Sequence, residues 1–242
     1  MNLEADLFSD IHLMSIQGHR VYCQQAWIYV IDDETLDFLF EQGWRRSGFH
    51  FFRLSREPIL GTNEAGNVLP LRIPVWDFTL TKSQRKIMRK NAAFTHRVRR
   101  ILPNETHQTL FELHRQRFTE RVPQFIEDFT GPEHDVLPTR GEILDVYDGD
   151  TLIATSFLDV TATSVSSIYA MFHPDYGAHS LGVYTMLLEI EYTQQRGGTF
   201  WYPGFAHHES SFYDYKKRFN NLEYFDWTRW LPYPRLTDGT EK

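Results

Sequence analysis

The sequence predicts an α+β fold in which helices flank a mixed β-sheet, preceded by a small N-terminal α/β region. Two observations carry this prediction. After Asn104, the apolar patterns follow the order helix, three strands, helix, strand, helix and strand. Before it, short strands and one helix alternate with loops, without repeats or a linker rich in Pro, Gly and Ser. We expect an N-terminal region over residues 1–75 and a main domain over residues 76–242.

Three strands and one helix are expected in the N-terminal region, from apolar patterns and their turn-forming ends. They are a strand at Trp27–Ile31, a helix from Asp32 or Asp33 to about Gln42, a strand at Arg46–Leu54 and a strand at Val68–Val75. Pro58–Asn67 contains two glycines and two asparagines and is expected to be a loop. Because Pro70 and Pro74 cannot donate to a ladder, we expect Val68–Val75 to be an edge strand.

The main domain is expected to begin with a helix capped by Thr81 or Ser83, and further helix and strand patterns follow it. The expected elements are helix Lys82–Phe94, strand Phe94–Leu102, helix Asn104–Arg121, hairpin Glu142–Tyr147 and Thr151–Val160, strand Ser164–Phe172, turn Pro174–Gly177, amphipathic helix Leu181–Arg196, strand Thr199–Phe205, helix Ser210–Phe219 and strand Leu222–Trp227. Three antiparallel strands followed by strand–helix–strand are the layout of acyltransferases of the N-acetyltransferase (GNAT) type.

The loop before the long helix bears on acetyl-coenzyme A, the usual substrate of that fold. Such enzymes place small residues and an Arg or Gln there, so that backbone N–H groups approach the phosphates. The loop Asp175–Gly182 has no Arg or Gln at the expected offset, and Asp175 adds a negative charge. These residues disfavour acetyl-coenzyme A, and we expect no cofactor.

Basic side chains are concentrated in one segment of an acidic chain. The net charge is −7, yet Phe78–Asn104 contains eight of the 25 Lys and Arg residues and no acid. Five of them share one face of the expected helix: Lys82, Arg85, Lys86, Arg89 and Lys90. Like charges four residues apart repel, which favours a visiting polyanion over a merely solvated face, although the latter stays open.

Cysteine and histidine usage argues against a metal centre. Cys23 is the only cysteine, which excludes an intramolecular disulfide and a multi-cysteine site. His207 and His208 are adjacent, so on a strand they would point to opposite faces. The sequence also contains no targeting signal and no stretch approaching 18 apolar residues, so we expect a cytoplasmic protein without a metal or a membrane partner.

Several blocks resemble, in order, those of arginyl-tRNA–protein transferases and their bacterial leucyl-transferring relatives. The blocks are Gly43-Trp44-Arg45-Arg46-Ser47-Gly48, Leu71-Arg72-Ile73-Pro74-Val75 with Phe78, Lys82-Ser83-Gln84-Arg85-Lys86, Arg89-Lys90-Asn91, Ser166-Ser167-Ile168-Tyr169, Ser180-Leu181-Gly182, Tyr202-Pro203-Gly204-Phe205, and Tyr215-Lys216 with Phe219. They extend from about Trp27 to Trp227.

The resemblance implies transfer of an amino acid, arginine or leucine, from aminoacyl-tRNA to the N-terminus of a protein that begins with Asp or Glu. It implies a GNAT-like aminoacyltransferase domain, with tRNA and an acceptor protein as partners and no DNA. Two departures stand out: the four-cysteine cluster common in the family is missing, and His173 replaces an acidic residue. A related transferase with a small-molecule or other peptide acceptor, and an RNA-binding protein with a degenerate site, remain alternatives.

Within this resemblance, the site residues are assigned as follows. The five basic residues of the helix bind the tRNA acceptor arm through phosphates. Asp159, a carboxylate among apolar residues, is a candidate proton acceptor, with a structural ion pair as the alternative. Tyr169 is the second catalytic candidate, and Arg46, Tyr215 and Lys216 are expected to bind the acceptor.

Overall fold

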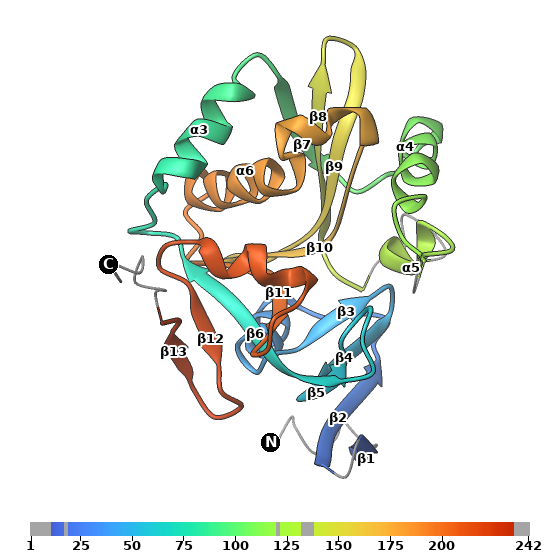
Figure 1. Ribbon diagram of the computed structural model, residues 1–242, viewed down its shortest axis with the longest axis vertical. Helices are drawn as coiled ribbons and strands as arrows, with labels where there is room; N and C mark the ends of the chain where they lie inside the picture. Colours follow the sequence, from blue (N-terminus) through green and yellow to red (C-terminus); the bar gives the residue numbers. More distant parts are fainter. Residues whose placement is uncertain (1–10, 17–18, 120–121, 132–137, 235–242) are drawn as a thin grey trace.

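The computed structural model describes residues 11–16, 19–119, 122–131 and 138–234, and within them strands form two β-sheets (Figure 1). The larger sheet has the order β13-β12-β6-β11-β10-β9-β8-β7, with β5 paired to β6. Its strands are β5 (Arg56–Pro58), β6 (Ala65–Pro74), β7 (Thr95–Arg100), β8 (Gly141–Asp148), β9 (Thr151–Val160), β10 (Ser164–Phe172), β11 (Phe200–His207), β12 (Glu223–Phe225) and β13 (Trp230–Pro232).

The expected GNAT-type layout is confirmed in the main domain. Strands β8, β9 and β10 are antiparallel, and β11 then pairs in parallel with β10. Between them in the chain lie η1 (Pro174–His179) and α6 (Leu181–Gln195). Gly149, with φ of +57°, turns the β8–β9 hairpin at the expected position. The fold class is therefore a mixed sheet with flanking helices.

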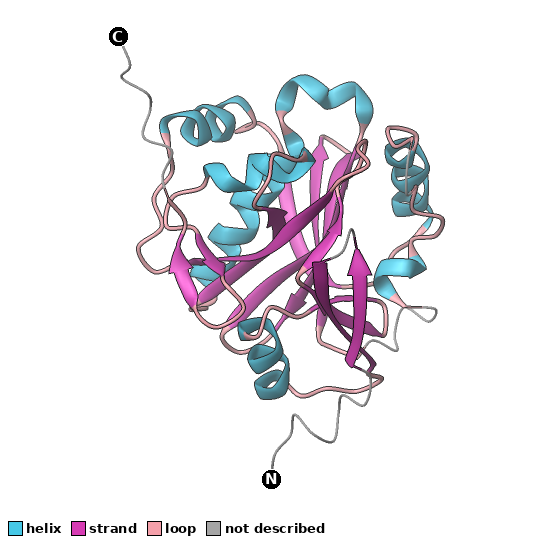
Figure 2. Cartoon of the chain, turned by 60° about the horizontal axis from the view of Figure 1, so that its bottom comes forward, coloured by secondary structure: helices cyan, strands magenta, loops and turns pink. Residues whose placement is uncertain are grey.

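Helices cover both faces of the larger sheet (Figures 1 and 2). One apolar core lies between the sheet and α6, over which α3 (Lys82–Lys90) packs. The other core lies under α4 (Glu105–Arg115) and α5 (Glu127–Thr130). Neighbouring strand residues such as Ile143 and Leu144 enter different cores, as expected for a sheet covered on both sides. Because α3 packs on its outer side, α6 is buried almost all round, and the expectation of an amphipathic helix was wrong.

The smaller sheet, in the order β1-β2-β4-β3, belongs to the N-terminal region. Its strands are β1 (Ile11–Ile16), β2 (His19–Trp27), β3 (Arg45–Ser47) and β4 (His50–Leu54), and α2 (Asp33–Glu41) packs beside them. The strand expected at Trp27–Ile31 was wrong, because β2 ends at Trp27. The strand expected at Arg46–Leu54 is a hairpin, since Gly48 turns the chain with φ of +56°. Asp32 caps α2 as predicted.

Strand β6 corrects another expectation, because it is not at an edge. It pairs with β11 on one side and with β5 and β12 on the other. Val68 donates its N–H toward the β5 side, so by alternation Pro70 and Pro74 also point to that side. There β5 pairs only with Ala65–Asn67 and β12 only with Leu71 and Arg72, so both prolines fall outside the ladder. Although β6 precedes residue 76, it lies inside the larger sheet.

Other elements differ in length or type from their sequence patterns. The segment after Ser210 is the 3₁₀ helix η2 (Phe212–Arg218), and the strand β13 was not anticipated. Helix α4 ends at Arg115, whereas Arg121, its expected end, lies outside the described residues. Among the helices that the structure describes, none has the length and apolar character to cross a membrane.

Candidate active site

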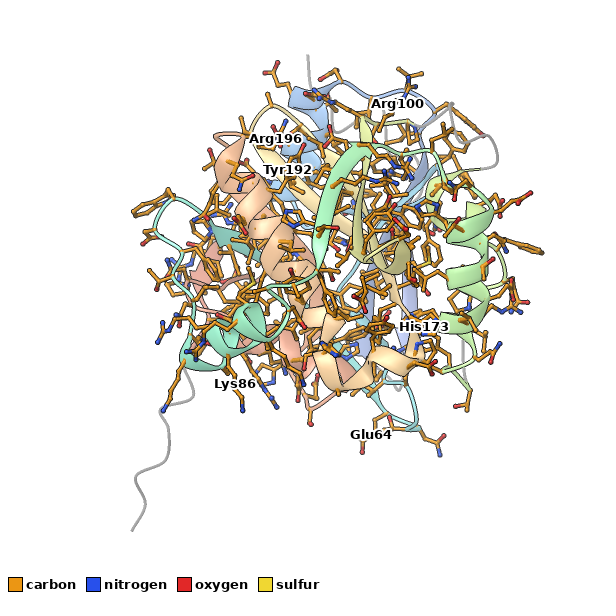
Figure 3. The ribbon with its side chains drawn as sticks, turned by 90° about the horizontal axis from the view of Figure 1, so that it is seen from above. Glu64, Lys86, Arg100, His173, Tyr192 and Arg196 are labelled. Carbon is orange, nitrogen blue, oxygen red and sulfur yellow. The ribbon has the colours of Figure 1, made fainter. Side chains whose placement is uncertain are left out.

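Helix α3 carries a basic surface. Thr81 caps its N-terminus, accepting from the Gln84 N–H while its own N–H donates to the Gln84 side chain. The five basic residues predicted to bind tRNA are all exposed: Lys82, Arg85, Lys86, Arg89 and Lys90. Within the described part of the chain, no carboxylate forms an ion pair with any of them. Lys86 projects away from the protein (Figure 3), so this surface is accessible to phosphate groups.

The C-terminal end of α3 is fixed to the segment that precedes α6. Lys90 donates to the Ala178 carbonyl at 2.6 Å, and the Asn91 amide donates to the His179 carbonyl at 3.0 Å. The Tyr184 hydroxyl of α6 donates to the Asn91 carbonyl at 3.4 Å. The basic surface is therefore held at the N-terminal end of the helix that packs across β8 to β11.

Strands β10 and β11 part after a short stretch of parallel pairing, which covers only residues 164–166 of β10. Both strands are irregular near this point. Strand β10 shifts its register against β9 between Ser167 and Tyr169, and β11 shifts against β6 between Trp201 and Gly204. Such irregularities bend strands and leave main-chain groups outside the ladder. We call this opening the β10–β11 split.

Arg45 reaches the β10–β11 split from strand β3. Its guanidinium donates to the Ser166 hydroxyl at 3.3 Å and to the Ser167 carbonyl. On the β11 side it faces Gly204, where an added Cβ would lie 3.1 Å from Arg45 Nη2. Gly204 has φ of +97°, which favours glycine. The glycine thus allows both the backbone bend and the close approach of the guanidinium.

Lys216 reaches the same glycine from η2. Its Nζ donates to the carbonyls of Pro203, at 2.9 Å, and Phe205, at 3.3 Å, the residues on either side of Gly204. An added Cβ at Gly204 would lie 3.2 Å from Nζ. Burial, and then the Arg45 cation, lower the pKa of Lys216 to about 7, and burial lowers the pKa of Arg45 to about 10. Two cations therefore meet over one backbone position.

Glu189 on α6 is the buried carboxylate whose charge acts on both cations. It is fully buried and accepts a hydrogen bond from Trp201 Nε1 at 3.0 Å. Burial raises its pKa to about 7, against the opposing effect of neighbouring hydroxyl and indole donors. At neutral pH it therefore offsets only part of the positive charge. Glu189 was not predicted as a site residue. It lies within the apolar run Leu187–Ile190, just as Asp159 lies among apolar residues, so the same pattern could have indicated it.

Arg46 and Asp159 form a buried ion pair, which corrects the roles expected of both. Arg46 Nε donates to the two carboxylate oxygens at 2.9 and 2.8 Å, and Arg46 Nη2 lies 2.5 Å from Oδ1. Thr139 donates a further hydrogen bond, and each side chain of the pair is 1% exposed. Both side chains are thus paired with each other and shielded from solvent. The ion-pair alternative for Asp159 is thus the one that the structure shows, and Arg45 rather than Arg46 faces the split.

Tyr169 and Tyr215 occupy different surroundings, and their functional roles stay predictions. Tyr169 stacks on Phe129 with 3.9 Å between ring centroids and packs against the core under α4. Burial raises its pKa, and its buried hydroxyl has no hydrogen-bond partner among the described residues. Tyr215 is half-buried beside the α6 core, and burial raises its pKa to about 12.

His207 and His208 lie in different surroundings. His207 is buried and its Nε2 lies 3.0 Å from a Glu57 carboxylate oxygen, whereas His208 is exposed. Across residues 11–16, 19–119, 122–131 and 138–234, no group of three or more His, Cys, Asp or Glu side chains is placed to hold an ion. The expectations of no metal and no cofactor remain predictions.

Solved structures superpose only weakly on this one. The C-terminal domain of a putative lysylphosphatidylglycerol synthetase from Agrobacterium fabrum superposes with a TM-score of 0.47 at 15% identity, covering 57% of this chain and 46% of that one. FemX superposes with a TM-score of 0.46 at 11% identity, covering 74% of this chain and 61% of that one.

Sequence relatives are closer and cover most of the chain. An aspartate/glutamate leucyltransferase of Shewanella sp. (strain MR-7) is 31% identical over 195 residues, 75% of this chain and 76% of that protein. The enzyme of the same name from Xylella fastidiosa (strain M23) is 28% identical and covers 96% of both chains. The model of the family described as "Arginine-tRNA-protein transferase, C terminus" matches residues 94–226, the range that contains β10, α6, β11 and η2. The chain belongs to the arginine-tRNA–protein transferase family.

Proposed function

We propose that the protein transfers leucine from leucyl-tRNA to the N-terminal amine of a protein that begins with Asp or Glu. The family match over residues 94–226 carries the proposal, since it spans the β10–β11 split. The names of the relatives from Shewanella and Xylella supply the amino acid and the acceptor residues. Arginine, named in the family description, is the second candidate for the transferred amino acid.

The reaction requires positioning more than covalent catalysis. The acceptor amine attacks the ester carbonyl, a C–N bond forms, and the C–O bond to the tRNA breaks. One proton passes, overall, from the amine to the departing ribose oxygen. An α-amino group has an ordinary pKa of about 8, so a useful fraction is neutral at physiological pH and a strong base is unnecessary. Holding the two reactants together supplies much of the rate.

We assign tRNA binding to the basic surface of α3 and acceptor binding to the β10–β11 split. Lys82, Arg85, Lys86, Arg89 and Lys90 hold tRNA phosphates without reading sequence. The β10–β11 split receives the acceptor. A tyrosine hydroxyl keeps its proton at neutral pH, and burial raises the pKa of both Tyr169 and Tyr215 further. Each can therefore donate a hydrogen bond, Tyr169 to the developing oxyanion and Tyr215 to the acceptor.

This function implies two partners and a location. Aminoacyl-tRNA supplies the amino acid, and a protein N-terminus accepts it. Because charged tRNA is found in the cytoplasm, the cytoplasm is the proposed site of action, without a membrane or DNA partner.

The test is transfer of labelled amino acid to defined peptides. Purified protein is incubated with labelled leucyl-tRNA or arginyl-tRNA and with peptides that begin with Asp, Glu, Asn or Lys. We expect leucine on the Asp and Glu peptides, detected by mass and by label. Arginine on the same peptides would select the second candidate. No label on any peptide would contradict the proposed function.

A further inference from the structure

Among the described residues, the two cations at Gly204 have only neutral hydrogen-bond partners. Arg45 donates to a serine hydroxyl and a carbonyl, and Lys216 donates to two carbonyls. Within the described residues, neither cation lies within 4.0 Å of a carboxylate oxygen, the limit at which an ion pair is counted. This is unusual for buried cations, which are costly unless a counter-charge accompanies them.

Neighbouring groups do not remove this imbalance. Glu189 is fully buried and accepts from the Trp201 indole through one carboxylate oxygen, and because burial raises its pKa to about 7 it carries only part of a negative charge at neutral pH. Asp159 acts on Arg45 at longer range but is occupied by Arg46. The site therefore retains a positive excess that a ligand anion can neutralise.

Arg45 and Lys216 each retain partial exposure over the whole residue, while their charged ends are desolvated. Arg45 also lines a shallow depression with room for about one water, whose other walls include Phe52, Arg53 and Phe205. A carboxylate that reaches the pair would meet a fork of donors from Arg45 and an ammonium from Lys216.

We propose that Arg45 and Lys216 together bind the side-chain carboxylate of the acceptor's first residue, over the glycine at position 204. This inference rests on the proposed function and assigns its acceptor specificity to two residues. The guanidinium offers a planar fork to the carboxylate, and the ammonium offers a second, pointlike charge. An amide at the same place, as in an N-terminal Asn, presents an NH₂ group to two cations and carries no negative charge.

The titration of Lys216 agrees with this geometry. The charged groups that face it are Arg45 from β3, Glu189 from α6 and, farther away, Glu57 from β5. Burial and Arg45 hold its pKa near 7 in the empty site. A bound carboxylate favours the ammonium form, so acceptor binding pulls a proton onto Lys216.

A phosphate of the tRNA is the competing anion for the same pair. Replacing the two cations distinguishes these ligands. If the pair binds the acceptor carboxylate, kcat/KM falls only for acidic acceptors. If the pair binds tRNA, kcat/KM falls equally for all acceptors.

The experiment compares two peptides that differ only in an N-terminal Asp or Asn. We would measure kcat/KM for each at saturating leucyl-tRNA, with the parent, Arg45→Met, Lys216→Met and the conservative Arg45→Lys. Lys217→Met is the matched control, because Lys217 is the next residue and instead pairs with Asp214 at 2.7 Å. Thermal unfolding of every variant confirms that it is folded.

We expect the parent to prefer Asp, and each Met variant to lower the Asp-to-Asn ratio by about ten- to one-hundredfold, the range for a hydrogen bond to a charged group. Arg45→Lys, which keeps the charge but loses the fork, should lower the ratio less, and Lys217→Met should not change it. A ratio that survives in Lys216→Met and Arg45→Lys, with both rates reduced equally, would overturn the site while leaving the proposed function intact. A parent that transfers leucine to neither peptide would overturn both.

Discussion

Arg45 and Arg46 are neighbours on strand β3 and have opposite surroundings. Arg46 is saturated by Asp159 and shielded from solvent, whereas Arg45 lies half-buried beside a second cation and has no carboxylate partner among the described residues. Successive strand residues point to opposite sides, so one step along the chain separates a group that holds the fold from one that is open to a ligand. The two arginines carry the same charge and differ in their partners. The comparison teaches that the lack of a carboxylate partner, rather than the charge, distinguishes the arginine that is open to a ligand.

The largest expected effect concerns the ion pair of Arg46 with Asp159. Removing one partner of a buried ion pair leaves an uncompensated charge, so Asp159→Asn or Arg46→Met should reduce the free energy of unfolding by about 3–5 kcal/mol. Urea denaturation measures this loss. Arg45→Met serves as the control and should cost far less, because no ion-pair partner is left behind. Equal losses at positions 45 and 46 would break the comparison.

A smaller effect is expected from Gly204→Ala. The residue has φ of +97°, and the new Cβ would crowd both cations, so we expect a loss of about 1–3 kcal/mol together with weaker discrimination between Asp and Asn acceptors. Gly61→Ala is the matched control, since Gly61 has φ of +76° but an added Cβ meets nothing within 4 Å. If the two variants lose the same stability and keep the same acceptor ratio, the close approach at Gly204 has no functional part.

The pH dependence of acceptor choice tests the role of Lys216 beside Arg45. Lys216 is charged below its pKa of about 7 and neutral above it, and Glu189 gains its negative charge over the same range. Both changes reduce the positive excess, so the Asp-to-Asn ratio of kcat/KM should be highest below pH 7 and fall by pH 9. The amine pKa of each peptide is measured separately, because the Asp carboxylate raises that of its own peptide, and the ratio is corrected for the neutral fraction of each amine. A ratio that is flat from pH 6 to 9 in the parent would contradict a role for Lys216.

The smallest effect per residue is expected at the basic surface of α3. Each phosphate contact contributes roughly 0.7–0.9 to the slope of log K against log salt concentration, so Arg85→Ala and Arg89→Ala should each flatten the salt dependence of tRNA binding by about that amount. The ratio between Asp and Asn acceptors should remain unchanged in both variants. Unaltered tRNA binding at low salt would exclude this helix as the contact.

Elements with local signals could be predicted from the sequence. The β8–β9 hairpin has a turn sequence at Asp148-Gly149, and α2 has a capping residue and a terminating glycine at Gly43. Strand β10 has the predicted bounds, Ser164–Phe172. In each of these elements, the residues that predict the structure lie within the element or directly beside it.

Features that depend on distant partners could not be predicted. The pairing of Arg46 with Asp159 joins residues 113 positions apart, and only the fold shows that Arg46 points away from the split. The place of β6 between β11 and β12 depends on segments at the other end of the chain, so its prolines suggested an edge. Lys216 could be proposed from its motif, but Glu189 and the meeting of Lys216 with Arg45 depend on the parting of β10 and β11, which no local pattern specifies.

Proton uptake on acceptor binding tests the central claim most directly. At pH 8, Lys216, with a pKa of about 7, is mostly neutral in the empty site, and a bound carboxylate should restore its proton. Calorimetry in two buffers of different ionisation enthalpy counts the protons taken up by an Asp peptide and by its Asn counterpart. We predict that the Asp peptide takes up about half to one proton more than the Asn peptide, a difference that disappears in Lys216→Met. Equal proton uptake by both peptides in the parent would contradict the assignment of Arg45 and Lys216 as the carboxylate site.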